Sequence, residues 1–271
     1  MELTYKLGLA LQAGGVRGFS HIAVLELLEQ YRAVPEIIAG SSIGAVVSAL
    51  YCIYEDSKAV YQILSKNVRA FLNKSIQSYP FAEVRMLFRE NLIELDEYYR
   101  FFREMFGKRR FSELNRKLLV VSFDLSERRS LVIEEGFIVD AVLASCTVPG
   151  FFQPTFLGGS KQLDGGILSP LPVSELRDHG AEFVIASAFE AEKTSIQTYE
   201  ELLAQLDSLR EKEIVEFEIG KADYAFVFPV KAEWMEFNKY RSIYEDAKKY
   251  LEGRKVDFEN FLRGRFNSLL V

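Results

Sequence analysis

Histidine and cysteine are scarce in this chain, and a long hydrophobic run is missing altogether. Two of the 271 residues are histidines and two are cysteines, Cys52 and Cys146, and neither cysteine stands in a metal-ligand spacing. We therefore expect no metal site; the residues leave open whether the two thiols form a disulfide. No run of about eighteen apolar residues occurs, so no membrane-spanning helix is predicted.

A basic excess is also missing. The chain has 33 basic and 39 acidic residues, a net charge of -6, which argues against a nucleic-acid partner. Residues 1–6 lack the basic start and apolar run of a signal peptide, so we expect a cytoplasmic protein that can touch a membrane peripherally. With 49% hydrophobic residues, the chain is long enough to form one sizeable core.

The first third of the chain alternates strand, turn and helix. Apolar runs predict strands at 6–12 and 37–39, and helical periodicity follows at 19–30 and 45–54. Such repetition is typical of parallel sheets with helices packed on them. We predict an α/β fold in which a central, mostly parallel sheet lies between two helical layers.

The rest of the chain predicts further strands and helices without repeats or linkers. Strands are expected at 118–123, 130–133, 183–188 and 225–230, and helices at 139–145, 200–220 and 243–251. Residues 56–107 show only helical periodicity, and a helical insertion is predicted over about 56–111. A single domain over 1–271 is the economical interpretation.

Aromatic side chains gather in this insertion. Phe101, Phe102 and Phe106 precede a basic run at 108–110. Amphipathic helices with a basic rim can lie on a membrane, so a lid or acyl-chain groove is one interpretation. Packing of the rings onto the sheet is the other, and we favour it.

A serine motif follows the second predicted strand. Gly40, Ser42 and Gly44 fit G-x-S-x-G, with an apolar strand before them and an apolar helix after them. A serine on a tight strand-to-helix turn needs small neighbours because the backbone is crowded there. Its hydroxyl then lies at a helix N-terminus, which favours developing negative charge. Ser42 is therefore the candidate nucleophile.

The glycine-rich segment after the first strand can supply backbone amides. Gly14, Gly15, Val16, Arg17 and Gly18 form a candidate oxyanion hole, because glycines let amides approach an anion closely. A nucleotide-binding loop is the alternative. It is weaker because the first glycine of G-x-G-x-x-G is missing and no acidic residue ends the second strand.

Asp164 is the candidate base. It precedes Gly165 and Gly166, so its own backbone leaves the side chain accessible, and partial desolvation would raise its pKa. His21, which lies within the first predicted helix, is expected to pack or to form a hydrogen bond. His179 is expected to cap a helix. The order Ser42, Asp164, His179 fits an α/β-hydrolase triad formally, but Ser42 follows only two strands, too early for that fold.

Three ordered motifs resemble the patatin-like phospholipases. They are Ala13-Gly14-Gly15-Val16-Arg17-Gly18, Gly40-x-Ser42-x-Gly44 and Asp164-Gly165-Gly166. The resemblance covers roughly residues 6–188 and implies a Ser42–Asp164 dyad, an oxyanion hole in the first loop and supporting roles for the remaining glycines. Two departures are Ala13, where the family has glycine, and Ser169-Pro170, where an asparagine is frequent.

The resemblance implies a lipid acyl hydrolase of phospholipase, lysophospholipase or carboxylesterase type. Its partner would be a lipid ester, and no metal or organic cofactor is implied. A non-catalytic lipid-binding or regulatory protein on the same fold is the alternative, followed by a nucleotide-binding protein that uses the first loop. The residues leave open the head group, chain length, position of attack, physiological role and oligomeric state.

Overall fold

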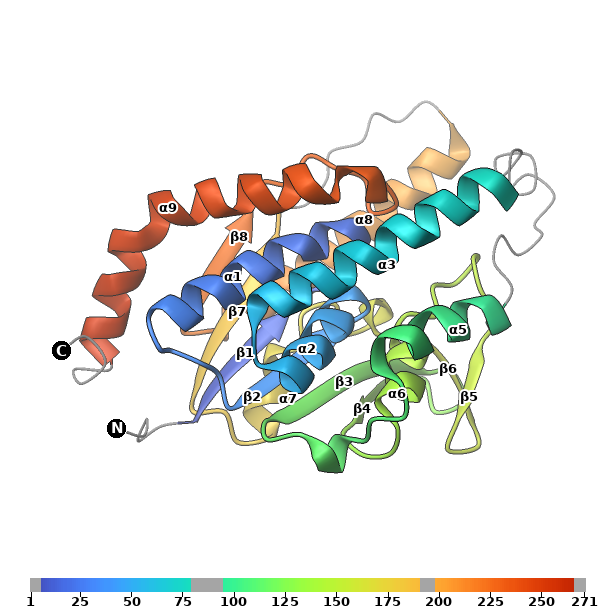
Figure 1. The fold of residues 1–271 in the computed structure, drawn as a ribbon, viewed down its shortest axis with the longest axis horizontal. Coiled ribbons are helices and arrows are strands. Elements are labelled where there is room, and N and C mark those ends of the chain that lie inside the picture. The colour runs from blue at the N-terminus through green and yellow to red at the C-terminus, as the bar shows by residue number, and fades with distance from the viewer. Residues whose placement is uncertain (1–5, 79–94, 191–197, 266–271) are drawn as a thin grey trace.

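A mostly parallel sheet forms the centre of the computed structural model, which describes residues 6–78, 95–190 and 198–265 (Figure 1). Within these residues the sheet has eight strands in the order β5-β6-β3-β2-β1-β7-β8, with β4 also paired to β3. The strands are β1 (Leu7–Leu11), β2 (Ile37–Ser41), β3 (Lys117–Asp124), β4 (Arg129–Ile133), β5 (Thr155–Leu157), β6 (Ser160–Asp164), β7 (Phe183–Phe189) and β8 (Tyr224–Phe228).

The five strands β3, β2, β1, β7 and β8 are parallel, and the antiparallel strands gather beside β3. All five residues of β1 are buried. Leu7, Leu9 and Leu11 join one apolar cluster, whereas Ala10 joins a second cluster on the other face. A strand covered on both faces has a continuous apolar run in its sequence, which is why this one could be predicted.

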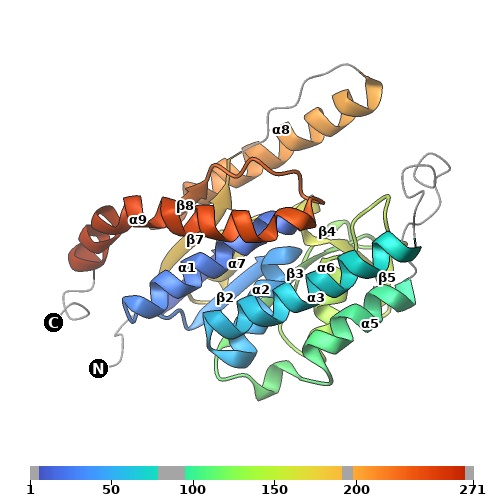
Figure 2. The ribbon, with the colours of Figure 1, turned by 45° about the horizontal axis from the view of Figure 1, so that its top comes forward.

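Helices cover both faces of the sheet (Figures 1 and 2). They are α1 (Phe19–Gln30), α2 (Ile43–Tyr54), α3 (Ser57–Ser78), α5 (Leu95–Phe106), α6 (Ile138–Ser145), α7 (Val173–Asp178), α8 (Tyr199–Ile219) and α9 (Tyr240–Arg265). On one face α2 and α6 pack on the central strands, and α7 with α8 lies on the other. The predicted three-layer α/β/α fold is confirmed. None of the described helices is both long and apolar enough to cross a membrane.

Two features differ from the predicted elements. The hairpin β5–β6 was not expected, because its strands have only three and five residues; the turn between them is Gly158-Gly159, and both glycines have positive φ. The last helix was predicted at 243–251 but continues to Arg265. Phe258 and Leu262, both fully buried, extend its apolar face beyond the predicted end.

The aromatic side chains of the predicted insertion pack into the core. Helices α3 and α5 lie in this stretch, and residues 79–94 between them are outside the described part of the chain. Phe102 and Phe106 are buried, and the half-buried Phe101 meets Phe71 edge to face at 5.9 Å between ring centroids. For these rings, packing is therefore observed rather than a solvent-facing stripe.

Phe106→Ala is expected to lower the free energy of unfolding by about 3–5 kcal/mol, because it leaves a cavity in the core. Urea unfolding monitored by circular dichroism measures this. Unchanged stability together with weaker vesicle binding would instead support the lid interpretation.

Candidate active site

Strand β3 brings together two chain segments that are far apart in sequence. Its residue Val121 pairs with Ser41, the last residue of β2. Its next residue, Ser122, pairs with Asp164, the last residue of β6. Because Ser42 directly follows Ser41, a single step along β3 places the predicted nucleophile and the predicted base beside one another.

Ser42 occupies a tight turn between β2 and α2 and has a left-handed backbone, with φ 53° and ψ −122°. A Cβ atom on Gly40 would overlap the backbone of Gly44, and one on Gly44 would overlap the carbonyl of Leu11. Both glycines of the motif are therefore required by close backbone approach, as predicted. The Ser42 side chain remains partly exposed.

A second serine holds this turn in place. The Ser42 amide donates a 2.9 Å hydrogen bond to Ser145 Oγ, and that hydroxyl donates to the Val121 carbonyl at 2.6 Å. The neighbouring Ser41 hydroxyl donates to the Ser169 carbonyl at 2.5 Å. Ser145 thus links α6, the serine turn and β3. Sequence reasoning missed its role, because nothing local marks a serine at the end of a helix as a ligand for a distant amide.

Asp164 is only 6% exposed. Its Oδ1 accepts a 2.7 Å hydrogen bond from the Gly166 amide. Burial raises the pKa of Asp164 to about 6, while hydrogen bonding by the Ser42 hydroxyl and the Gly166 amide lowers it and the negative charge of Glu211 raises it. A Cβ on Gly165 would overlap the Val121 carbonyl, so this glycine lets the aspartate turn lie against β3.

The glycine loop runs from Gly14, at φ 154°, through a 3-10 turn over Gly15–Gly18. Two of its amides are already engaged: Val16 donates to the Trp234 carbonyl at 2.8 Å and Arg17 to the Gly14 carbonyl at 3.2 Å. The amides of Gly14 and Gly15 donate to no other group among the described residues. These two are the amides that remain available to an anion.

The remaining members of the loop have other contacts. The Val16 side chain is buried in the core. Arg17 Nε donates to the Gly14 carbonyl at 3.1 Å, and its guanidinium lies 5.4 Å from the centroid of the Phe189 ring. A Cβ on Gly18 would overlap Ile43, the first residue of α2. Arg17 therefore braces the loop, and Gly18 lets it approach α2.

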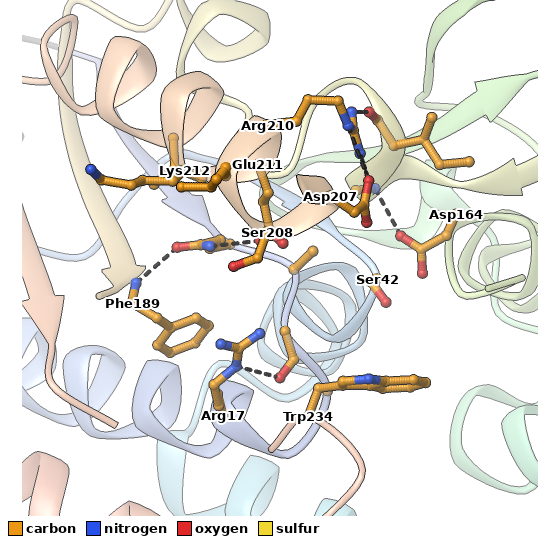
Figure 3. A pocket seen from close by; sticks show the side chains of 18 of the residues that line it. Arg17, Ser42, Asp164, Phe189, Asp207, Ser208, Arg210, Glu211, Lys212 and Trp234 are labelled. Carbon is orange, nitrogen blue, oxygen red and sulfur yellow. Dashed lines mark hydrogen bonds and ion pairs between the residues drawn. The ribbon is translucent and has the colours of Figure 1, made fainter. Parts of the chain in front are cut away.

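Ser42 and Asp164 both line a pocket of about 1280 Å³. Figure 3 shows them side by side, between residues of α8 on one side and Arg17 with Trp234 on the other. The α8 contribution includes residues 207–212. Neither Trp234 nor α8 carries a motif, so only the tertiary structure assigns them to this pocket.

The two histidines lie in structural positions. His21 is fully buried, with Nδ1 2.7 Å from Ser187 Oγ and Nε2 2.9 Å from the Gln12 carbonyl, and burial lowers its pKa to about 4. His179 is the C-cap of α7, and its Nδ1 lies 2.7 Å from the Glu175 carbonyl. Both expected roles are observed, because His21 is buried with hydrogen-bond partners outside its own helix and His179 caps α7.

The other potential ligands are dispersed. Within residues 6–78, 95–190 and 198–265, no three or more His, Cys, Asp or Glu side chains gather as a metal site would require. Cys52 and Cys146 are both buried free thiols, so they do not form the disulfide that the sequence had left open.

The fold and the site define an α/β protein with a serine on a strained strand-to-helix turn, facing a pocket it shares with a buried aspartate. The chain belongs to the patatin-like phospholipase family, whose model matches residues 9–177.

Curated relatives share the same region of the chain. The match to lysophospholipase NTE1 of Debaryomyces hansenii is 29% identical over 184 residues and covers 66% of this chain and 11% of the relative. The match to lysophospholipase NTE1 of Candida albicans is 30% identical, covering 66% and 13%. An uncharacterized NTE family protein of Mycobacterium tuberculosis is 28% identical, covering 67% and 48%. The matched region is thus half or less of each relative.

Two solved structures show distant similarity. VipD from Legionella pneumophila aligns over 93% of this chain and 67% of its own, at 15% identity and a TM-score of 0.45. The type III effector protein ExoU aligns over 92% of this chain and 52% of its own, at 14% identity and a TM-score of 0.45.

The backbone of Ser42 generates a stability prediction. Ser42→Gly is expected to be more stable than Ser42→Ala by about 1–2 kcal/mol, because glycine adopts this left-handed conformation without a Cβ clash. Both variants lack the hydroxyl, so the comparison isolates the backbone. Chemical denaturation of the two variants measures it, and equal stabilities would mean that the turn is not strained.

Proposed function

We propose that this protein is a serine lipid acyl hydrolase in which Ser42 is the nucleophile and Asp164 the base. The observation that carries the proposal is that both side chains line one pocket, and that burial raises the pKa of Asp164 to about 6. A carboxylate with that pKa is ionised at neutral pH and is a better proton acceptor than an ordinary aspartate.

In the first step the Ser42 oxygen attacks the acyl carbonyl carbon while Asp164 accepts the hydroxyl proton. The tetrahedral intermediate then collapses, the bond to the leaving alcohol breaks, and Asp164 returns the proton to that oxygen. In the second step Asp164 takes a proton from water, and the water oxygen attacks the acyl-serine. The bond to the Ser42 oxygen then breaks, Asp164 returns the proton to that oxygen, and the fatty acid is released. One ester and one water are consumed, and one alcohol and one acid are formed.

The negative oxygen of the intermediate needs donors that are already oriented. The amides of Gly14 and Gly15 are the proposed oxyanion hole, because the Val16 and Arg17 amides donate to backbone carbonyls. Helix α2 begins at Ile43, immediately after the nucleophile, so the positive end of its dipole adds to the stabilisation.

The proposed substrate is a phospholipid, lysophospholipid or related acyl ester. The family description and the curated name lysophospholipase NTE1 support this substrate class. The place of action that we propose is the cytoplasm, with peripheral contact at a membrane.

A fluorophosphonate probe is expected to label the wild type and to leave Ser42→Ala unlabelled, because the probe traps an activated serine. Ester hydrolysis should fall at least about 1000-fold in Ser42→Ala and in Asp164→Asn. Fluorescent gel readout and turnover of a short-chain p-nitrophenyl ester provide the measurements.

The matched control is Ser41→Ala, which removes the adjacent hydroxyl. That hydroxyl is fully buried against the Ser169 carbonyl, so its loss should leave the label in place. Equal labelling of wild type and Ser42→Ala would contradict the proposal. Vesicle binding without any turnover would favour a non-catalytic lipid-binding protein, and tight binding of an adenine nucleotide would favour the nucleotide alternative.

The raised pKa of Asp164 predicts a pH dependence. Below about pH 6 the carboxyl is protonated and cannot accept the Ser42 proton, so kcat/KM should fall about tenfold per pH unit and be flat above. Hydrolysis of a soluble ester between pH 4 and 9 measures the profile.

Glu211→Gln is the companion variant. The negative charge of Glu211 raises the pKa of Asp164, so its removal should shift the acidic limb to lower pH. A shift of the acidic limb to higher pH in Glu211→Gln would assign the titration to a group other than Asp164. Persistence of the limb in Asp164→Asn would do the same.

A further inference from the structure

Helix α8 carries a large share of the apolar side chains that face solvent. Of the twelve large exposed apolar side chains among the described residues, six lie on this helix. They are Tyr199, Leu202, Leu203, Leu206, Leu209 and Phe217. Figure 2 shows the first part of α8 extending beyond the body of the molecule. Its later part is anchored, because Val215 is buried and Glu218 accepts a 2.7 Å hydrogen bond from the Ser174 amide of α7.

The exposed side chains are ordered along one face. Tyr199, Leu202, Leu206 and Leu209 follow one another at intervals of three, four and three residues, which is the spacing of a single helical stripe. The interval continues at Glu213, so the stripe ends after about 15 Å of helix. Apolar heptad spacing indicates a coiled coil when it is sustained over about three to four heptads, and this stripe is shorter, so its length does not favour a coiled coil with a second copy of the chain.

The stripe is continuous with the candidate active site. Leu209 is 47% exposed and also lines the pocket that contains Ser42. Two further exposed apolar residues directly follow lining residues: Leu168 follows Ile167, and Met235 follows Trp234. Arg210 of α8 donates to the Ile167 carbonyl, which joins the helix to this part of the rim. The stripe therefore has one end at the pocket, at Leu209, and its other members run outward along α8.

The charge of α8 limits which kinds of lipid surface this helix can bind. The helix contains seven acidic and two basic residues, and the whole chain has a net charge of -6. An anionic surface would be repelled, whereas a zwitterionic or uncharged lipid surface would not. Leucine side chains gain free energy when they leave water for the acyl region of such a surface.

We propose that the α8 stripe formed by Tyr199, Leu202, Leu206 and Leu209 inserts into a zwitterionic lipid surface and seats the mouth of the pocket against it. The inference rests on the proposed lipid hydrolase function for its purpose, but the binding itself requires no catalysis. The lipid ester would then enter the pocket past Leu209 without crossing water.

The test is vesicle sedimentation in a Ser42→Ala background, so that no lipid is hydrolysed. Binding to phosphatidylcholine vesicles is expected to weaken about tenfold in Leu206→Asp, because a charge replaces an inserted apolar side chain. The matched control is Val256→Asp, an equally radical change at a 72% exposed position of α9, which should bind as the parent does. Circular dichroism and the melting temperature verify that both variants fold.

A second arm separates this inference from the proposed function. In protein that keeps Ser42, the Leu206→Asp variant should hydrolyse a soluble butyrate ester at the parent's rate. Its hydrolysis of phosphatidylcholine in vesicles should fall about tenfold, in proportion to the lost binding. If no ester is hydrolysed at all, the proposed function fails while the binding comparison still decides the inference.

Three results would overturn it. The first is equal vesicle binding by the parent and Leu206→Asp. The second is tighter binding to vesicles that contain phosphatidylglycerol, lost on neutralising the basic run at 108–110 instead. The third is a dimer in analytical ultracentrifugation that Leu206→Asp dissociates, without vesicle binding by the parent, which would make a second copy of the chain the occupant.

Discussion

The pairing of β3 with two different strand ends is the constraint on which the site depends. Val121 is held by the end of β2 and Ser122 by the end of β6, and consecutive residues of a strand are only about 3.3 Å apart. The serine turn and the aspartate turn therefore meet wherever this register forms. The Ser145 hydroxyl reinforces the junction, because it joins the Ser42 amide to the Val121 carbonyl.

The site concentrates unfavourable features that the surrounding structure compensates. Ser42 has a backbone conformation that glycine would adopt more easily. Burial disfavours the charged form of Asp164, which is why its pKa is raised. Gly40 and Gly44 provide the space, and the Gly166 amide partly offsets the burial of charge. The paired strands β2, β3 and β6 beneath these turns keep both residues in place, which a mobile loop could not do.

Most of the sheet could be predicted from the sequence, since buried parallel strands are short apolar runs bounded by turns. The Ser42 turn was equally accessible, because its steric requirement involves residues only two positions away. The role of Asp164 came from a resemblance and from two following glycines. The hairpin β5–β6 was not predicted, because its strands are short. The end of α9 was mispredicted because Phe258 of this helix packs against rings of distant segments, such as Tyr31 and Phe226.

Local sterics and hydrophobic pattern, which sequence alone contains, thus determined the class of fold, the serine turn and the glycine loop. Tertiary structure decided which amides of that loop remain available, because the Trp234 carbonyl engages the Val16 amide from a segment over 200 residues away. It also decided that Phe102 and Phe106 of α5 are buried, whereas several leucines of α8 face solvent and one of them, Leu209, lines the pocket. Helical periodicity specifies an apolar face, but only the packed neighbours determine whether that face is covered.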